Sequence, residues 1–119
     1  MIRTAAAADF DAIVRVEPRV RAFPESNGPG APGAPRRLGG AAFVAEAHGE
    51  VAAFLLAFRE SVDYDSPNYR WFDTRYDRFL YVDRVVVSSR ARDAGLGSAL
   101  YRNVFGKAAA DAVPCVVCE

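Results

Sequence analysis

The sequence predicts an α/β domain in which a sheet that contains a β-hairpin is flanked by helices. Two apolar segments, 41–49 and 50–61, meet at a short turn, a pattern typical of a hairpin. Segment 79–87, FLYVDRVVV, is the most strand-like part of the chain. From 95 to 112 the apolar residues recur at helical spacing. Strand and helix patterns therefore share one chain, as in the α/β class.

Length, charge and cysteine content limit the kinds of protein that this chain can be. Its 119 residues are the size of one domain, so we expect a single domain spanning 1–119. The formal net charge is zero, which argues against a nucleic-acid binder because no cationic excess faces the phosphates. No apolar run approaches the ~20 residues of a membrane span, and no signal peptide is apparent, so we expect a cytoplasmic protein without a membrane partner.

Cys115 and Cys118 have the spacing of a redox or zinc pair. A redox pair usually opens a helix, however, and a zinc site needs two further ligands. The only histidine, His48, is far away in sequence. We therefore expect plain buried thiols, a reducing compartment and no metal site.

The first forty residues predict a strand, a helix and a loop. Segment 1–5 is typical of a short opening strand, and apolar residues between 7 and 17 follow helical spacing. Pro18 should end this helix, because its ring clashes with the carbonyl four residues earlier. Segment 23–40 is crowded with Pro and Gly and predicts a mobile surface loop or, alternatively, a lid over a site.

The hairpin predicted next turns at His48-Gly49-Glu50. Its second strand is apolar on both faces, which predicts a central strand covered from both sides. Segment 62–79 is rich in aromatic and charged residues without a clear period, and we expect a loop there. Its aromatic residues form a substrate wall or a dimer contact, or they fold back on the core. The candidate substrate residues are Tyr64, Tyr69 and Trp71 in this segment and Asp83 in the strand that follows.

Gly95 and Gly97 stand between the 79–87 strand and the predicted helix. The first amides of a helix lack intrahelical acceptors and carry partial positive charge, and glycines let a phosphate approach the backbone closely. A Walker A loop is excluded because Ser98 stands where its lysine belongs. A dinucleotide fingerprint is a poor match, since Leu100 replaces the third glycine.

The longer pattern VVVSSRARDAGLGSALY, residues 85–101, closely resembles the acetyl-coenzyme A signature of the GNAT superfamily of N-acetyltransferases. The core of that signature, [R/Q]-x-x-G-x-[G/A], corresponds here to residues 92–97. Segments 2–16 and 43–58 similarly resemble the first strand and helix of the family and its central hairpin. The resemblance implies a mixed, mostly antiparallel central sheet flanked by helices. Because the family continues beyond the strand at 115–119, we expect its last helix and strands to be missing here.

By this resemblance the co-substrate is acetyl-CoA, which threads a gap between the 82–87 strand and the 115–119 strand. The backbone of Val85 and Val87 would bond its acetyl and pantetheine part, and residues 92–98 would cradle its pyrophosphate. The implied cofactor-binding residues are Val85, Val86, Val87, Arg92, Asp93, Ala94, Gly95, Leu96, Gly97 and Ser98.

The resemblance also implies transfer of the acetyl group to an amine of a small molecule or a peptide. Such an amine must be neutral to attack, and its pKa of ~8 to ~10.4 makes a base or proton relay useful. Glu119 is the candidate catalytic base, since several family members carry a Glu at the end of that strand. Asp83 and Glu46 are weaker candidates. A strand amide near 85–87 could stabilise the oxyanion.

Two other functions stay open. The chain could be a non-catalytic or truncated CoA-binding or interaction module that keeps the cofactor turn without the acceptor half. It could also be an unrelated nucleotide-binding α/β protein. Binding of CoA separates this last alternative from the other two, and acetyl transfer to amines separates the enzyme from the binding module.

Overall fold

The computed structural model describes residues 2–20, 23–25, 37–89, 91 and 95–118, with the backbone alone for 23–25, 37 and 38. The elements are, in chain order, β1 (Ile2–Thr4), the 3-10 turn η1 (Ala7–Asp9), α1 (Phe10–Val16), β2 (Phe23–Glu25), β3 (Arg37–Ala47), β4 (Glu50–Arg59), α2 (Pro67–Asp73), β5 (Leu80–Val87), α3 (Leu96–Ala110) and β6 (Val116–Cys118). None of the helices described is long and apolar enough to cross a bilayer.

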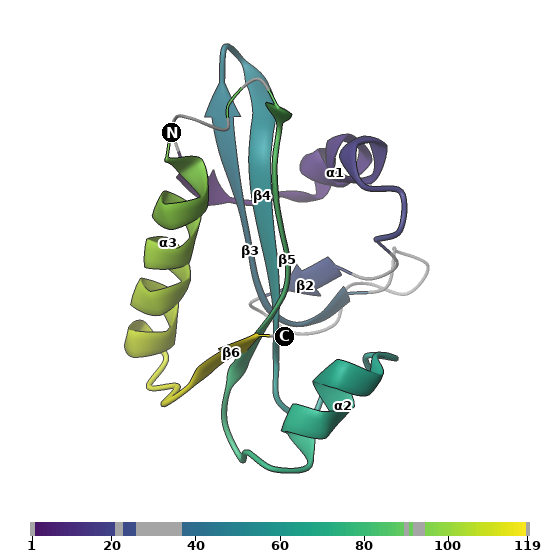
Figure 1. Cartoon of the computed structure of the whole chain (residues 1–119), viewed down its shortest axis with the longest axis vertical. Helices are drawn as coiled ribbons and strands as arrows, with labels where there is room; N and C mark the ends of the chain where they lie inside the picture. Colours follow the sequence, from purple (N-terminus) through teal and green to yellow (C-terminus); the bar gives the residue numbers. More distant parts are fainter. Residues whose placement is uncertain (1, 21–22, 26–36, 90, 92–94, 119) are drawn as a thin grey trace.

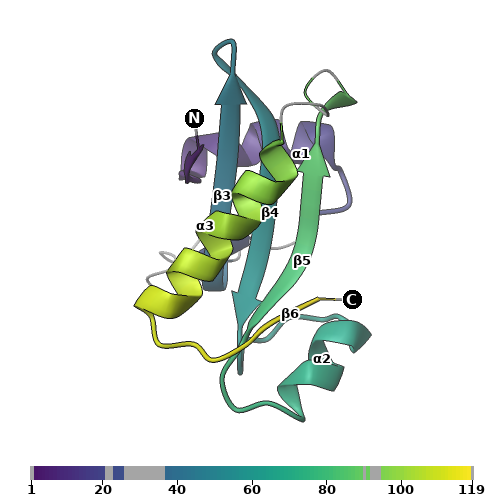
Figure 2. The same ribbon diagram turned by 60° about the vertical axis from the view of Figure 1, so that its left-hand side comes forward.

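One sheet runs through the middle of the molecule in the order β1-β3-β4-β5-β6, and β2 pairs with the start of β3. The pairs β1–β3, β3–β4 and β4–β5 are antiparallel, whereas β2–β3 and β5–β6 are parallel. Helix α3 covers one face of the sheet, and α1 and α2 lie on the other (Figures 1 and 2). The expected mixed, mostly antiparallel sheet flanked by helices is thus confirmed.

The central hairpin forms as the sequence predicts. His48 and Gly49 both have positive φ, 55° and 77°, which is the backbone of a two-residue turn whose twist suits a hairpin. Ala47 and Glu50 pair directly across this turn. The next strand, β4, is buried from Ala53 to Phe58 and has strand neighbours on both sides. It is the central strand that its two-faced apolar pattern predicts.

Apolar side chains pack on both faces of this sheet. The face under α3 is filled by residues of β3, β4 and β5 together with Leu100 and Val104, which are fully buried on α3. On the opposite face Ile13 of α1 packs against β3 and β4. A third cluster lies under α2 and includes Tyr69 and Tyr81. Helices therefore cover both faces of the central strands, and two of them, α1 and α3, are those that the apolar spacing of the sequence anticipates.

Two segments differ from the sequence predictions. Segment 62–79, expected to be a loop, contains α2. Ser66 caps this helix by accepting a hydrogen bond from the Tyr69 N–H at 3.3 Å, and Pro67 occupies its first turn, where a missing N–H costs nothing. Segment 23–40, expected to be one loop, holds β2 and the start of β3 at its ends. Its middle, 26–36, lies outside the described residues.

Candidate functional site

Half of β5 has an open edge. Strand β6 pairs with β5 only over Leu80–Val82, whereas β4 follows β5 to its end. The Ser88 N–H donates to a carbonyl of β4 at 2.7 Å. Backbone hydrogen-bonding groups point to alternate sides along an extended strand, so those of Val85 and Val87 point away from β4. No strand within the described residues covers that side. A ligand can therefore bond these backbone groups as an added strand would.

The turn before α3 presents a second set of backbone donors. Gly95 is the N-cap, with a φ of 71° in the left-handed region that favours glycine. The first intrahelical bond runs from the Ala99 N–H to the Gly95 carbonyl at 3.1 Å. The amides of residues 96–98 precede this bond and point out of the helix end, where the macrodipole is positive.

These two features adjoin. A Cβ atom placed on Gly97 would lie 3.9 Å from Cγ2 of Val87, so the first turn of α3 sits against the last residue of β5. Figure 2 shows the start of α3 and the end of β5 at the same end of the sheet. The open strand edge thus leads directly to the unbonded amides of α3.

A β-bulge interrupts the pairing of β5 with β4. Leu56 pairs with Arg84 and its neighbour Ala57 pairs with Val82, which leaves Asp83 as the extra residue of β5. Successive residues of a regular strand point to opposite faces, but a bulge breaks this alternation. Val82 and Val85 consequently both pack on the α3 side of the sheet.

The bulge places two charged neighbours on the other face, where four side chains form what we call the bulge cluster: Tyr64, Asp83, Arg84 and Glu17. The Tyr64 hydroxyl donates to Asp83 Oδ1 at 2.7 Å, and Arg84 Nε lies 3.3 Å from Asp83 Oδ2. Arg84 Nη1 donates to Glu17 Oε1 at 2.7 Å. Burial and, next, the Asp83 carboxylate raise the pKa of Tyr64, so this hydroxyl keeps its proton at neutral pH.

A family model, described as the acetyltransferase (GNAT) family, matches residues 16–118. The chain belongs to the GNAT family. A comparison with curated proteins finds no significant match.

Solved structures with this fold include acetyltransferases that are named for different substrates. One is an aminoglycoside acetyltransferase from an uncultured soil metagenomic sample (17% identity, 66% of this chain and 45% of the other, TM-score 0.52). A second is a ribosomal-protein-alanine N-acetyltransferase from Brucella melitensis biovar Abortus 2308 (20% identity, 66% and 49%, TM-score 0.51). A third, the aminoglycoside N-acetyltransferase AAC(6')-Iy in complex with CoA, is matched over the whole of this chain and 78% of its own (12% identity, TM-score 0.60). At these identities the likeness shows the fold.

The chain is short beside some of these proteins. It spans about half the length of the soil aminoglycoside acetyltransferase and of the ribosomal-protein-alanine N-acetyltransferase, 45% and 49%.

The candidate cofactor residues fall partly within the described chain. Val85 and Val87 expose backbone groups at the open edge, and residues 95–98 form the adjoining turn. Val86 pairs with Phe54 of β4, and Arg92, Asp93 and Ala94 lie outside the described residues. The candidate base Glu119 also lies outside them.

The candidate substrate residues separate into three environments. Tyr64 and Asp83 are hydrogen-bonded to each other in the bulge cluster. Tyr69 is 1% exposed, and its hydroxyl donates to the Arg59 carbonyl at 2.5 Å, so it follows the alternative in which the aromatic residues fold back on the core. Trp71 is half exposed on α2, with the Arg75 guanidinium 3.9 Å from its ring centroid.

The thiols differ from the expectation as well. Cys115 and Cys118 are free, but Cys115 is only half-buried and Cys118 is exposed. Cys118 is the last residue of β6, and an edge position of this kind keeps its side chain in reach of solvent. The prediction of buried thiols is therefore wrong for Cys118.

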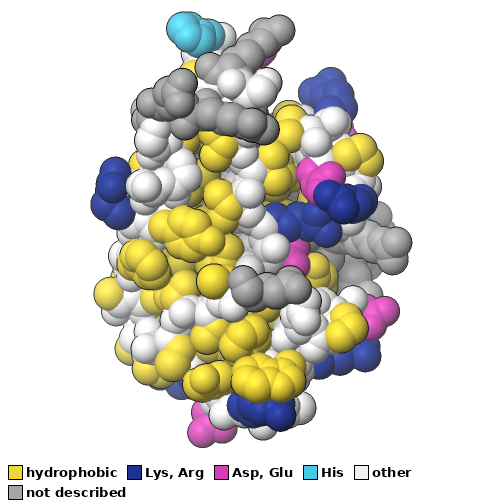
Figure 3. Space-filling view, viewed as in Figure 1, with side chains coloured by type: hydrophobic (Ala, Val, Ile, Leu, Met, Phe, Trp, Pro, Cys, Tyr) yellow, Lys and Arg dark blue, Asp and Glu magenta, His cyan; other side chains and the backbone are white. Residues whose placement is uncertain are grey.

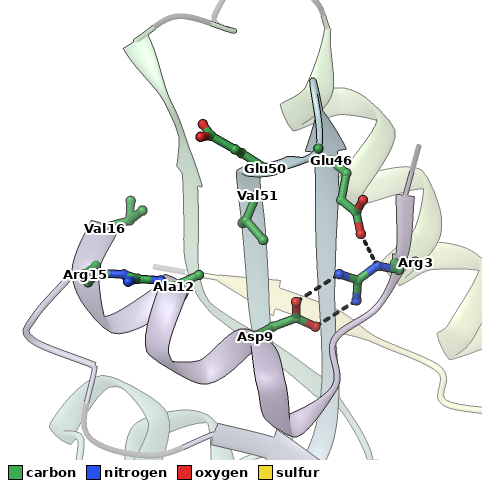
Figure 4. A pocket seen from close by; sticks show the side chains of 9 residues that line it. Arg3, Asp9, Ala12, Arg15, Val16, Glu46, Glu50 and Val51 are labelled. Carbon is green, nitrogen blue, oxygen red and sulfur yellow. Dashed lines mark hydrogen bonds and ion pairs between the residues drawn. The ribbon is translucent and has the colours of Figure 1, made fainter.

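An open pocket of about 530 Å³ lies on the α1 face beside the β3–β4 hairpin. Figure 4 shows Arg3 bridging two acidic residues of its wall, Asp9 and Glu46. Arg3 Nη1 and Nη2 donate to Asp9 at 2.7 and 2.9 Å, and the Ala6 N–H donates to the same carboxylate at 2.7 Å. Glu46, a weaker candidate base, is thus ion-paired with Arg3 on the opposite face from α3. Sequence reasoning gave no indication of this bridge.

Replacing Asp9 by Asn should make the free energy of unfolding less dependent on pH in the acid range. The Arg3 hydrogen bonds hold the pKa of Asp9 below its usual value. The resulting stabilisation is full above the unfolded-state pKa of ~3.9 and is lost as pH falls through the lower folded-state value. We expect Asp9→Asn to reduce the free energy of unfolding by about 1–2 kcal/mol at pH 7 and progressively less below pH ~4. Urea unfolding at pH 7 and pH 3 measures this, and an equal loss at both would contradict it.

Proposed function

We propose that this GNAT-family chain binds acetyl-CoA along the open β5 edge and transfers its acetyl group to an amine. The observation that carries the proposal is the continuity of donors, from the outward backbone groups of Val85 and Val87 to the unbonded amides of residues 96–98. The CoA complex of a protein with this fold supports the proposal.

The residues present fit such a cofactor. A pantetheine chain contains amide groups that can bond an open strand edge as a peptide does. The pyrophosphate suits a helix N-terminus, and the absence of a side chain at Gly97 lets it approach the backbone. We extend this cradle to Arg92, Asp93 and Ala94, which directly precede Gly95 in the sequence.

Acetyl-CoA supplies an activated thioester, whose acetyl group passes to the amine nitrogen as the C–S bond breaks and the sulfur receives the proton of the amine. The outward amides of Val85 and Val87 can donate to the oxyanion that develops at the carbonyl. Arg84 of the bulge cluster directly precedes Val85 in β5, and we propose that its neighbours Asp83 and Tyr64 bind the acceptor amine. Glu119 stays a proposed base that deprotonates it.

The acceptor is an amine of a small molecule or a peptide. Aminoglycosides and ribosomal-protein alanine are the acceptors named for neighbours of the same fold. The second candidate function is a CoA-binding module without transfer, since the open β5 edge and the adjoining turn account for cofactor binding alone.

Calorimetric titration with CoA and a thiol-release assay test the two functions together. We expect CoA to bind in the micromolar range and thiol to appear when acetyl-CoA is mixed with glucosamine, an aminoglycoside or an alanyl peptide amide. Binding without thiol release would favour the module. Absence of CoA binding at millimolar concentration would overturn both.

A further inference from the structure

Arg84 lies between two carboxylates and is bound by them unequally. Its Nη1 is 2.7 Å from Glu17 Oε1, whereas its Nε is 3.3 Å from Asp83 Oδ2. A charge-assisted hydrogen bond of this kind usually measures about 2.7–2.9 Å, so the second contact is long. Arg84 is therefore held mainly by Glu17, which is 67 residues away in sequence, and less by its neighbour Asp83.

The Asp83 carboxylate consequently keeps acceptor capacity. A carboxylate offers about four lone-pair sites, and a bidentate Arg–Asp pair would occupy one on each oxygen with short bonds. Here Oδ1 accepts the Tyr64 hydroxyl at 2.7 Å, and among the described side chains Oδ2 has only the long contact with Arg84. Asp83 can accept a further donor without breaking a short bond.

The balance of charge in the bulge cluster favours a cationic ligand. Asp83 and Glu17 are 12% and 14% exposed, and the single guanidinium among them, Arg84, is 27% exposed. Arg19 also pairs with Glu17, but it is 79% exposed and its charge is well solvated. Figure 3 shows basic and acidic side chains gathered between α1 and α2 on this side of the molecule. An ammonium ion entering beside Asp83 would balance the second carboxylate.

We propose that Glu17 holds Arg84 away from Asp83 and thereby keeps the Asp83 carboxylate available for the ammonium group of the acetyl acceptor. The inference rests on the proposed function and deepens it. Glu17 and Arg84 are positioning residues: they act on the acceptor through Asp83. If the Glu17 carboxylate were removed, Arg84 would move from its long contact into a short ion pair with Asp83.

Steady-state kinetics of Glu17→Gln test this role, with acetyl-CoA as donor and glucosamine or an alanyl peptide amide as acceptor. In the variant, Arg84 closes on Asp83 and competes with the ammonium. We expect the KM for the amine to rise about tenfold, with kcat and the Kd for CoA within about twofold of wild type. A rise confined to the KM for the amine is not what a general loss of structure produces.

The double variant Glu17→Gln/Arg84→Gln makes the test decisive. It removes the competing cation and leaves Asp83, so we expect the KM to return to within about threefold of the wild-type value. If the pair were merely structural, the double variant would be at least as impaired as Glu17→Gln. The matched control Glu50→Gln/Arg102→Gln makes the same charge changes at two exposed positions and should leave the KM unchanged.

The outcomes separate the inference from the proposed function. If wild type acetylates an amine, and Glu17→Gln leaves its KM unchanged or the double variant does not recover, only the inference is overturned. If wild type acetylates neither amine, the transfer function fails in the unmodified protein and the inference falls with it.

Discussion

Gly97→Glu should weaken CoA binding by at least about a hundredfold, because it puts a carboxylate where the proposed site receives a pyrophosphate. The variant is expected to fold. Gly97 lies in the first turn of α3, where an acidic side chain gains about 0.3–1 kcal/mol from the helix dipole and glycine is a poor helix former. Calorimetric titration with CoA beside a thermal melt measures both properties. Undiminished binding would refute the placement of the site.

Two further glycine variants separate charge from shape. Gly97→Ala adds a Cβ atom 3.9 Å from Val87, an ordinary contact, so a smaller loss of CoA affinity than in Gly97→Glu is expected. Gly106 lies later on the same helix, and beyond the backbone of that helix no atom of the described residues lies within 4 Å of an added Cβ. Gly106→Glu should therefore bind CoA as wild type does. Equal losses in all three variants would point to a defect of α3 as a whole.

Leu100→Ala should give the largest loss of stability among single substitutions on α3. Leu100 is 0% exposed and packs against the sheet in the cluster that holds this helix. Removing such a side chain costs about 2–5 kcal/mol through lost burial and the cavity left behind. This is a large part of the roughly 5–15 kcal/mol that a typical domain has. Urea unfolding monitored by circular dichroism gives the value.

Phe105→Ala is the matched control for Leu100→Ala. Phe105 is on the same helix but 53% exposed, so its removal should cost less than about 1 kcal/mol. A loss as large as that of Leu100→Ala would mean that α3 packs differently from the arrangement described. CoA affinity measured in Leu100→Ala at a temperature where it is folded should stay close to wild type, since Leu100 packs against the sheet and the proposed donors of the turn are backbone amides.

The sequence predicted the elements whose signals are local. Apolar spacing of three and four residues located α1 and α3, and two apolar runs around His48-Gly49 located the hairpin. The Gly95-x-Gly97 turn predicted the donor-rich helix end, since strand, turn and helix follow one another directly in the chain. Each of these features is determined within about twenty residues.

Helix α2 was within reach of the sequence but was missed. Ser66 and Pro67 together are a helix-start signal, a capping hydroxyl followed by a proline in the first turn. The aromatic residues after them obscured the helical period, because apolar side chains stand on both faces of the helix. Tyr69 is buried, whereas Trp71 is exposed. Whether an aromatic side chain in such a segment turns inward depends on what packs beneath it.

By itself, the sequence determined the fold class, the family signature and the turn before α3, because these depend on residues adjacent along the chain. Only the tertiary structure decided where charge lies beside the open β5 edge. One extra residue in the β4–β5 pairing turns Asp83 and Arg84 to the same face, and the end of α1 brings Glu17 to meet them. Strand register and the packing of a helix bring together residues far apart in the chain, and no local sequence pattern predicts such contacts.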